Sequence, residues 1–213
     1  MNVTTISKRW SGLFVAVGLS VTAAACGTST RFLSTWSARD AQPVAANGLR
    51  IATVFFNQNE SVRRESEDVI ANEVARYGAM PVPSYNIVPD NPNDREAAKR
   101  KLEQAGVDAV LSMRVVARER VLDYGPGYWA GSPHYGSLWG YWGYGWGGVN
   151  DPSFLGSDVV VGVETLLYSL KDEKLLWAGM SETFDADDVR SAVKSIARKA
   201  VKEMDEQSVL TRF

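Results

Sequence analysis

Apolar residues between positions 48 and 207 follow two spacings, one typical of strands and the other typical of helices. Runs of β-branched and aromatic residues have the length of strands and are followed by turn residues. Between these runs, apolar residues recur every three or four positions, which is the period of a helix with one buried face. The predicted elements are, in chain order, strand 49–56, helix 60–77, strand 79–82, helix 94–104, strand 108–121, hairpin strands 159–170 and 175–184, and helix 188–207.

Two of these elements show their period most clearly. The strand over 108–121 alternates, so that Ser112 and Arg114 share one face while Leu111, Met113 and Val115 share the other. The last helix, which an aspartate at 185 or 187 is expected to cap, has apolar residues on a single face. That expected buried stripe consists of Val189, Val193, Ile196, Ala197, Ala200 and Met204.

The order β-α-β-α-β-β-β-α predicts an α/β fold with helices packed on a mixed sheet. Alternating strands and helices in the first half indicate βαβ units, and the hairpin over 159–184 adds two further strands. We assign 48–213 to one α/β domain, interrupted by a Gly/Trp/Tyr-rich insertion over 124–156.

This insertion has the most unusual composition in the chain. Between Tyr124 and Asn150 there are nine glycines, five tyrosines and four tryptophans in 27 residues. Glycine at every second or third position disfavours both helix and strand, so we predict a loop. The candidate interaction residues of this loop are Tyr124, Tyr128, Trp129, Tyr135, Trp139, Tyr141, Trp142, Tyr144 and Trp146.

Aromatic rings on a glycine-rich backbone suit several roles. They can form a surface for a partner protein, a stacking platform for glycan rings such as those of peptidoglycan, or a patch that enters the membrane interface. The alternative is a low-complexity insertion that is tolerated between two strands and has no specific ligand.

The amino terminus has the pattern of a secretory signal peptide, which we assign to residues 1–25. Lys8 and Arg9 precede an apolar stretch over 12–25, and its 14 residues are fewer than the roughly 20 that span a hydrocarbon core. Small residues then lead directly to Cys26, the only cysteine of the chain. Because there is no second cysteine, an internal disulfide is excluded.

The sequence Ala23-Ala24-Ala25-Cys26-Gly27 resembles the lipobox of bacterial lipoproteins, although Ala23 stands where leucine is commonest. The resemblance implies that Cys26 is acylated and anchors the chain to a membrane. Gly27 is not the aspartate that retains enteric lipoproteins in the inner membrane, which implies the periplasmic face of the outer membrane. An ordinary signal cleavage site followed by an unmodified cysteine is the alternative.

Residues 26–47 are predicted to be the lipidated cysteine and a linker, because Ser, Thr, Ala and Gln are frequent and no period is evident. The linker has three large apolar residues, Phe32, Leu33 and Trp36. We expect them to form a first strand or to pack at the edge of the domain rather than to bind a ligand.

Other candidate sites are weak. The formal net charge of -2 provides no basic field for nucleic acid, and no nucleic-acid partner is expected. His134, the only histidine, has no second histidine or further cysteine with which to form a zinc site, and 90–94 lacks the glycine and glutamate of a calcium loop. We therefore expect no metal or cofactor. A basic stripe in the last helix, expected to be a solvated face, consists of Arg190, Lys194, Arg198 and Lys202.

The predicted domain is similar to small periplasmic lipoprotein domains related to the amino-terminal domain of TolB and to the lipoprotein activators of penicillin-binding proteins. The similarity lies in the first strand and helix over 51–77, the entry into the long strand over 106–111, the hairpin end Leu175-Leu176-Trp177-Ala178-Gly179 and the final helix. It implies an interaction or assembly protein and brings no active-site residues.

The sequence as a whole predicts a lipid-anchored, non-enzymatic lipoprotein that contacts a partner or a surface in the cell envelope. The alternative is a protein that binds or modifies peptidoglycan or another glycan through the aromatic segment. Such an enzyme would need carboxylates beside the aromatic residues, and Asp123, Asp151 and Asp158 are nearest in sequence.

Overall fold

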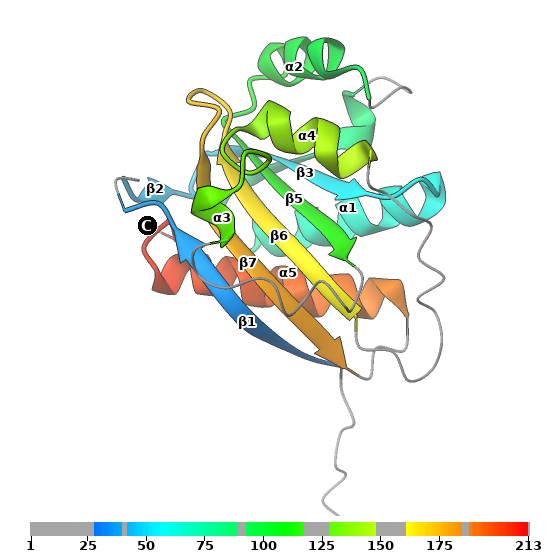
Figure 1. Ribbon diagram of the computed structural model, residues 1–213, viewed down its shortest axis with the longest axis vertical. Helices are drawn as coiled ribbons and strands as arrows, with labels where there is room; N and C mark the ends of the chain where they lie inside the picture. The colour runs from blue at the N-terminus through cyan, green and yellow to red at the C-terminus, as the bar shows by residue number, and fades with distance from the viewer. Residues whose placement is uncertain are drawn as a thin grey trace, which may run out of the picture.

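The computed structural model describes residues 28–39, 42–88, 93–116, 128–147, 161–184 and 188–212. Six strands form one mixed sheet in the order β1-β7-β6-β5-β3-β4 (Figure 1). β3 is parallel to β4 and β5, whereas the pairs β5/β6, β6/β7 and β1/β7 are antiparallel. The strands are β1 (Ser29–Ser37), β3 (Arg50–Phe56), β4 (Met80–Pro83), β5 (Ala109–Val116), β6 (Val161–Ser169) and β7 (Leu175–Phe184).

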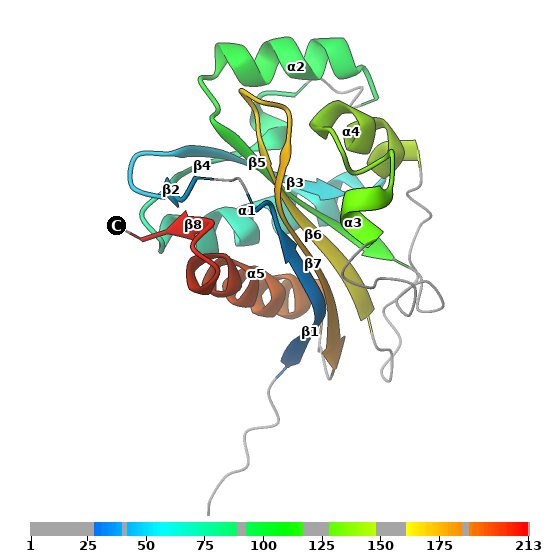
Figure 2. The same ribbon diagram turned by 60° about the vertical axis from the view of Figure 1, so that its left-hand side comes forward.

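Helices cover both faces of this sheet, so the domain has three layers (Figures 1 and 2). One face packs against α1 (Glu60–Ala75) and α5 (Val189–Glu206), and the other packs against α2 (Arg95–Gln104) and α4 (Leu138–Gly147). Two short pieces, α3 (Tyr128–Gly131) and the 3-10 helix η1 (Ser84–Asn86), complete the helical elements described. None of the helices in the described ranges is long and apolar enough to cross a membrane.

Capping side chains mark the starts of the three main helices α1, α2 and α5, and glycines follow the ends of two of them. Asn59, Asp94 and Asp188 each accept backbone N–H bonds with their side chains at the start of α1, α2 and α5. The cap of α5 is therefore Asp188, and the expected cap at 185 or 187 is wrong. Gly78 and Gly106 follow α1 and α2 with φ of 94° and 64°, a conformation that suits glycine after a helix.

The predicted α/β class with helices on a mixed sheet is confirmed. Each predicted helix and strand between 49 and 207 is present, with ends that differ by at most a few residues except in the long strand, where β5 is described to Val116. The predicted alternation in this strand is also confirmed: Leu111 and Met113 pack under α1 and α5, and Arg114 faces the layer that contains α4.

The predicted linker over 26–47 is wrong for most of its described residues. Ser29–Ser37 is the edge strand β1, which pairs with β7 from Ser29 opposite Phe184 to Ser37 opposite Trp177. β2 (Val44–Ala45) forms a small parallel ladder with β8 (Leu210–Thr211). The first strand expected from Phe32 and Trp36 therefore exists, and the folded domain begins well before residue 48.

Candidate functional site

The aromatic segment, predicted as a loop, contains α3 and the ten-residue helix α4. The prediction of a loop is wrong for these residues. The buried residues of α4 are Leu138, Tyr141, Trp142, Gly145 and Trp146, which recur at steps of three and four and so form one helical stripe. The stripe packs on the sheet, where the Phe56 ring meets the rings of Tyr141, Trp142 and Trp146 edge to face.

Burial on the sheet explains why a glycine-rich sequence is helical here. Each glycine in a helix costs up to about 1 kcal/mol, whereas burying one large apolar side chain contributes about 2–3 kcal/mol. Glycine also allows the close approach: a Cβ on Gly145 would lie 2.8 Å from the Phe56 ring. Tertiary packing therefore outweighs local propensity in this segment.

Most of the predicted interaction residues lie inside the protein. Five of them are buried, namely Trp129, Tyr135, Tyr141, Trp142 and Trp146. Tyr128, Trp139 and Tyr144 are partly exposed, and Tyr124 lies outside the described residues. His134 is exposed and stacks on the Tyr144 ring at 4.9 Å. The segment is thus mainly a packing layer, and only its half-buried rings are available at the surface.

Beneath this layer lies a buried ion pair. Arg114 of β5 donates to Glu164 Oε2 of β6 from Nη2 at 2.7 Å and from Nε at 3.1 Å. Tyr141 of α4 donates its hydroxyl proton to the same oxygen at 3.3 Å, and the Tyr144 ring lies 4.5 Å from the guanidinium carbon. Aromatic side chains of α4 therefore cover the charged residues of the sheet face.

Burial dominates the electrostatics of this group. It raises the pKa of the Glu164 carboxyl, while the Arg114 guanidinium acts in the opposite direction. Burial and the neighbouring carboxylate also raise the pKa of Tyr141 well above its usual value, which keeps the hydroxyl protonated as a donor. Both charged groups are enclosed, and the cluster joins β5, β6 and α4.

The accessible candidate site is a cavity of about 1460 Å³ at one end of the sheet. Parts of the chain that are far apart in sequence line it, among them the end of β1 with the residues after it, α2 with the start of β5, the segment from α3 to α4, and the turn between β6 and β7. Aromatic residues contribute through Trp36, Trp129 and Tyr135, of which Trp36 is only partly buried. The cavity therefore combines aromatic surface with the polar residues of a turn and a helix.

Glu173 joins three of the elements around this cavity. Its side chain pairs with Lys99 of α2, and its carbonyl oxygen accepts a hydrogen bond of 2.9 Å from Leu138 N at the start of α4. Its φ of 55° is unusual for a residue other than glycine. The hydrogen bond from Lys99 lowers the pKa of Glu173, so the carboxylate stays charged at the rim.

Further charged residues surround the same opening. Glu103, Asp108, Lys171, Asp172 and Lys174 line it, so both signs of charge are present. Within the described ranges, no three His, Cys, Asp or Glu side chains come together in a way that would hold a metal ion. The mixture of aromatic and polar groups suits a polar ligand with apolar faces or a protein segment.

Trp129 and Tyr135 were predicted from the sequence as interaction residues, but the cavity that they line was not. Trp36 was expected to pack in a first strand or at the domain edge rather than to bind a ligand, and it lines the cavity from the end of β1. Lys99 and Glu173 were not predicted as site residues, because they lie far apart in the chain and meet only after the sheet has formed. The amino-acid composition around Glu173 does not indicate its positive φ. Cys26 lies outside the described residues, two positions before Thr28.

No family model matches the chain, and no curated protein matches it. Two solved structures of the PelC dodecamer from Paraburkholderia phytofirmans are similar to it. A PelC variant is 13% identical with a TM-score of 0.43, covering 81% of this chain and 96% of its own. The second PelC structure is 14% identical with a TM-score of 0.43, covering 82% of this chain and 94% of its own. Values this low assign no function.

Proposed function

We propose that this protein is a lipid-anchored, non-enzymatic lipoprotein of the outer membrane that binds a partner in the periplasm through the cavity at the end of β1. The anchor is Cys26, as the lipobox resemblance implies. A role in contact or assembly is what the sequence resemblance to envelope lipoproteins related to the TolB amino-terminal domain implies. The cavity supplies the surface on which a protein partner binds.

The path of β1 is the observation that carries this proposal. The strand begins at Ser29, three residues after Cys26, and ends at Ser37 beside the cavity. Nine residues of extended chain span about 30 Å. A lipid on Cys26 therefore holds one end of the sheet at the membrane, while the opposite end, with the cavity, extends into the periplasm.

The anchor is tested by replacing Cys26 with serine. The native chain is expected in the membrane fraction with a mass increase from the acyl chains, and the Cys26→Ser chain in the soluble periplasmic fraction. Unchanged membrane association and unchanged mass would exclude acylation of Cys26.

The cavity is tested by filling its mouth at Gly136. A Cβ at this position would meet no atom within 4 Å, so a side chain can start there without a clash, and Gly136→Trp places a ring at the cavity. Gly147→Trp is the matched control, because a Cβ there also has free space and the residue does not line the cavity. Site-specific crosslinking in cells should lose partners with Gly136→Trp and keep them with Gly147→Trp. Identical partner sets would contradict the cavity proposal.

A second candidate function is peptidoglycan binding, favoured by the partly exposed ring of Trp36, which lines the cavity beside charged residues. Sugar rings stack on aromatic faces, and their hydroxyl groups bond to carboxylates and ammonium groups. Co-sedimentation with purified peptidoglycan separates the two functions. Binding lost in Gly136→Trp and kept in Gly147→Trp favours the glycan, and release of soluble fragments would overturn the non-enzymatic proposal.

A further inference from the structure

A second hollow, of about 480 Å³, lies along α5 beside the first described residue of the chain. We call it the basic groove. Its lining contains four cations of α5, namely Lys194, Arg198, Lys199 and Lys202, together with two serines of the same helix and Thr28. No acidic residue is among the described residues that line it. The groove is thus positively charged and provides hydroxyl donors.

The four cations have different partners. Lys199 Nζ donates to the Thr30 carbonyl oxygen at 2.8 Å, and Lys202 Nζ pairs with Glu206 at 2.8 Å on the exposed surface of α5. An exposed pair of this kind is weak because water screens both charges, so Lys202 exchanges its partner easily. Lys194 is exposed and forms no ion pair with the described part of the chain.

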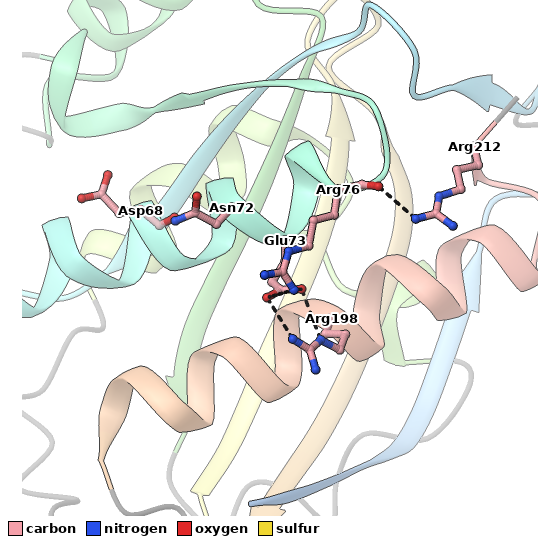
Figure 3. A network of polar contacts seen from close by, with 6 residues as sticks. All are labelled: Asp68, Asn72, Glu73, Arg76, Arg198 and Arg212. Atoms are coloured by element: carbon pink, nitrogen blue, oxygen red, sulfur yellow. Dashed lines mark hydrogen bonds and ion pairs between the residues drawn. The ribbon is translucent and has the colours of Figure 1, made fainter.

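Arg198 belongs to a polar network between α1 and α5 (Figure 3). Its Nε lies 3.3 Å from Glu73 Oε2, and Arg76 Nη1 lies 3.2 Å from Glu73 Oε1. Two guanidinium groups therefore share one carboxylate, which leaves a net positive charge beside the groove. The network also links α5 to α1, because the buried carboxylate of Glu73 in α1 pairs with Arg198 of α5.

The groove lies next to the proposed anchor. Thr30 of β1 donates its hydroxyl proton to Ser195 Oγ at 2.8 Å. Its carbonyl oxygen accepts the hydrogen bond from Lys199, so the start of β1 is held on α5. Thr28, which lines the groove, is two residues from Cys26. Two residues of extended chain reach at most about 7 Å. A lipid on Cys26 would therefore bring the groove to the headgroup region of the membrane.

We propose that the basic groove binds the phosphate of an anionic phospholipid headgroup in the membrane that carries the Cys26 anchor. This inference rests on the proposed function, since it uses the anchor to identify the occupant. The diacylglyceryl group of an acylated cysteine has no phosphate, so the ligand is a neighbouring lipid. An acyl anchor combined with a basic patch attaches a protein more firmly than either does alone, and the groove would also fix the orientation of the domain.

The test uses residues 26–213 with Cys26→Ser, a chain that contains every residue of the described fold and has no acyl group. Its partition onto vesicles of phosphatidylethanolamine with phosphatidylglycerol is compared with its partition onto neutral phosphatidylcholine vesicles. Removing Lys194 and Lys202 as Lys194→Gln with Lys202→Gln should weaken partition onto anionic vesicles roughly 10- to 30-fold, since each basic residue near such a surface contributes about a fivefold factor. The matched control is Arg100→Gln with Lys101→Gln, which removes two exposed charges from α2 on the other side of the sheet and should keep the partition within about twofold.

Equal losses in the two double variants, or no preference for anionic vesicles, would overturn the groove proposal. Inorganic phosphate at constant ionic strength should compete weakly, and full displacement by millimolar phosphate would identify a site for free phosphate instead. The vesicle result does not depend on acylation. A native chain found in the soluble fraction would therefore refute the anchor at Cys26. The vesicle measurement would still decide whether the basic groove binds anionic lipid.

Discussion

Arg114 and Glu164 are register partners on β5 and β6, and their side chains meet at 2.7 Å with exposed fractions of only 4% and 0%. Two opposite charges in the interior stabilise a fold only when their remaining bonding positions are occupied. Tyr141 and Tyr144 of α4 supply part of that cover, through a hydroxyl group and a ring face. The pair therefore explains why tyrosines, and not only tryptophans, lie on this side of α4.

Removing the cation should destabilise the protein strongly. In Arg114→Met the Glu164 carboxylate stays buried without its partner, and we expect a loss of about 3–5 kcal/mol in the free energy of unfolding at pH 7, measured by urea denaturation. The loss should shrink as the pH falls, because a protonated Glu164 carries no unpaired charge. Arg114→Met combined with Glu164→Leu should recover most of the stability. A double variant no more stable than the single variant would contradict the unpaired-charge explanation.

Gly145 should not tolerate a side chain, because the Phe56 ring occupies the place of its Cβ at 2.8 Å. Phe56 is buried and packs against three aromatic rings, so Gly145→Ala should destabilise the protein by about 1–3 kcal/mol despite the better helix propensity of alanine. Gly147→Ala, in the same helix with no atom near its Cβ, should leave the melting temperature unchanged or slightly raised. Similar melting temperatures for the two variants would show that α4 does not pack closely on β3.

The helices and strands of the sheet were predictable because their apolar spacing and the strand composition agree with the final packing. α4 was missed although its spacing was in the sequence: positions 138, 141, 142, 145 and 146 form a helical stripe. The frequency of glycine favours a loop, yet the free energy of burying aromatic rings on a sheet exceeds the propensity cost of glycine. Local propensity therefore fails where an element is stabilised mainly by tertiary contacts.

The candidate sites were predictable to different degrees. The basic stripe of α5 was visible as a four-residue period, but the sequence could not show that Arg198 pairs with Glu73 of α1, 125 residues away. The cavity was not predictable, because Trp36, Lys99 and Glu173 become neighbours only through the sheet topology. Periodicity reveals which face of an element is buried, whereas a site built from several elements requires the fold.

β1 should contribute to stability as part of the sheet, not as a linker. The Phe32 ring meets the Trp177 ring edge to face at 5.5 Å, and it fills the space above Gly179. Phe32→Ala should cost about 1–3 kcal/mol in thermal or urea unfolding. Leu33→Ala is the control, because Leu33 is 39% exposed at the irregularity in the β1 register, and its loss should be within about 0.5 kcal/mol. Equal effects of the two substitutions would argue against specific packing of Phe32 on β7.

A buried carboxyl group in α1 should make stability depend on pH. Glu67 is fully buried, and it accepts hydrogen bonds from Ser84 Oγ at 2.7 Å, Tyr85 N at 2.9 Å and Phe55 N at 3.2 Å. Burial nevertheless raises its pKa from 4.5 to about 7. Because the folded state then binds the proton more tightly than the unfolded state, the contribution of Glu67 to stability should be highest below about pH 4.5 and should be lost as the pH rises through about 7.

This loss is measured against Glu67→Gln, which has no titrating group at the same place. The free energy of unfolding of the native chain should fall relative to this variant by roughly 3 kcal/mol between pH 4 and pH 8, and the difference should be constant outside the range of the two pKa values. Glu65→Gln, on the exposed side of the same helix, should give a curve parallel to that of the native chain. A native curve parallel to that of Glu67→Gln would show that the three hydrogen bonds to the carboxylate outweigh its burial and hold the pKa near the unfolded value.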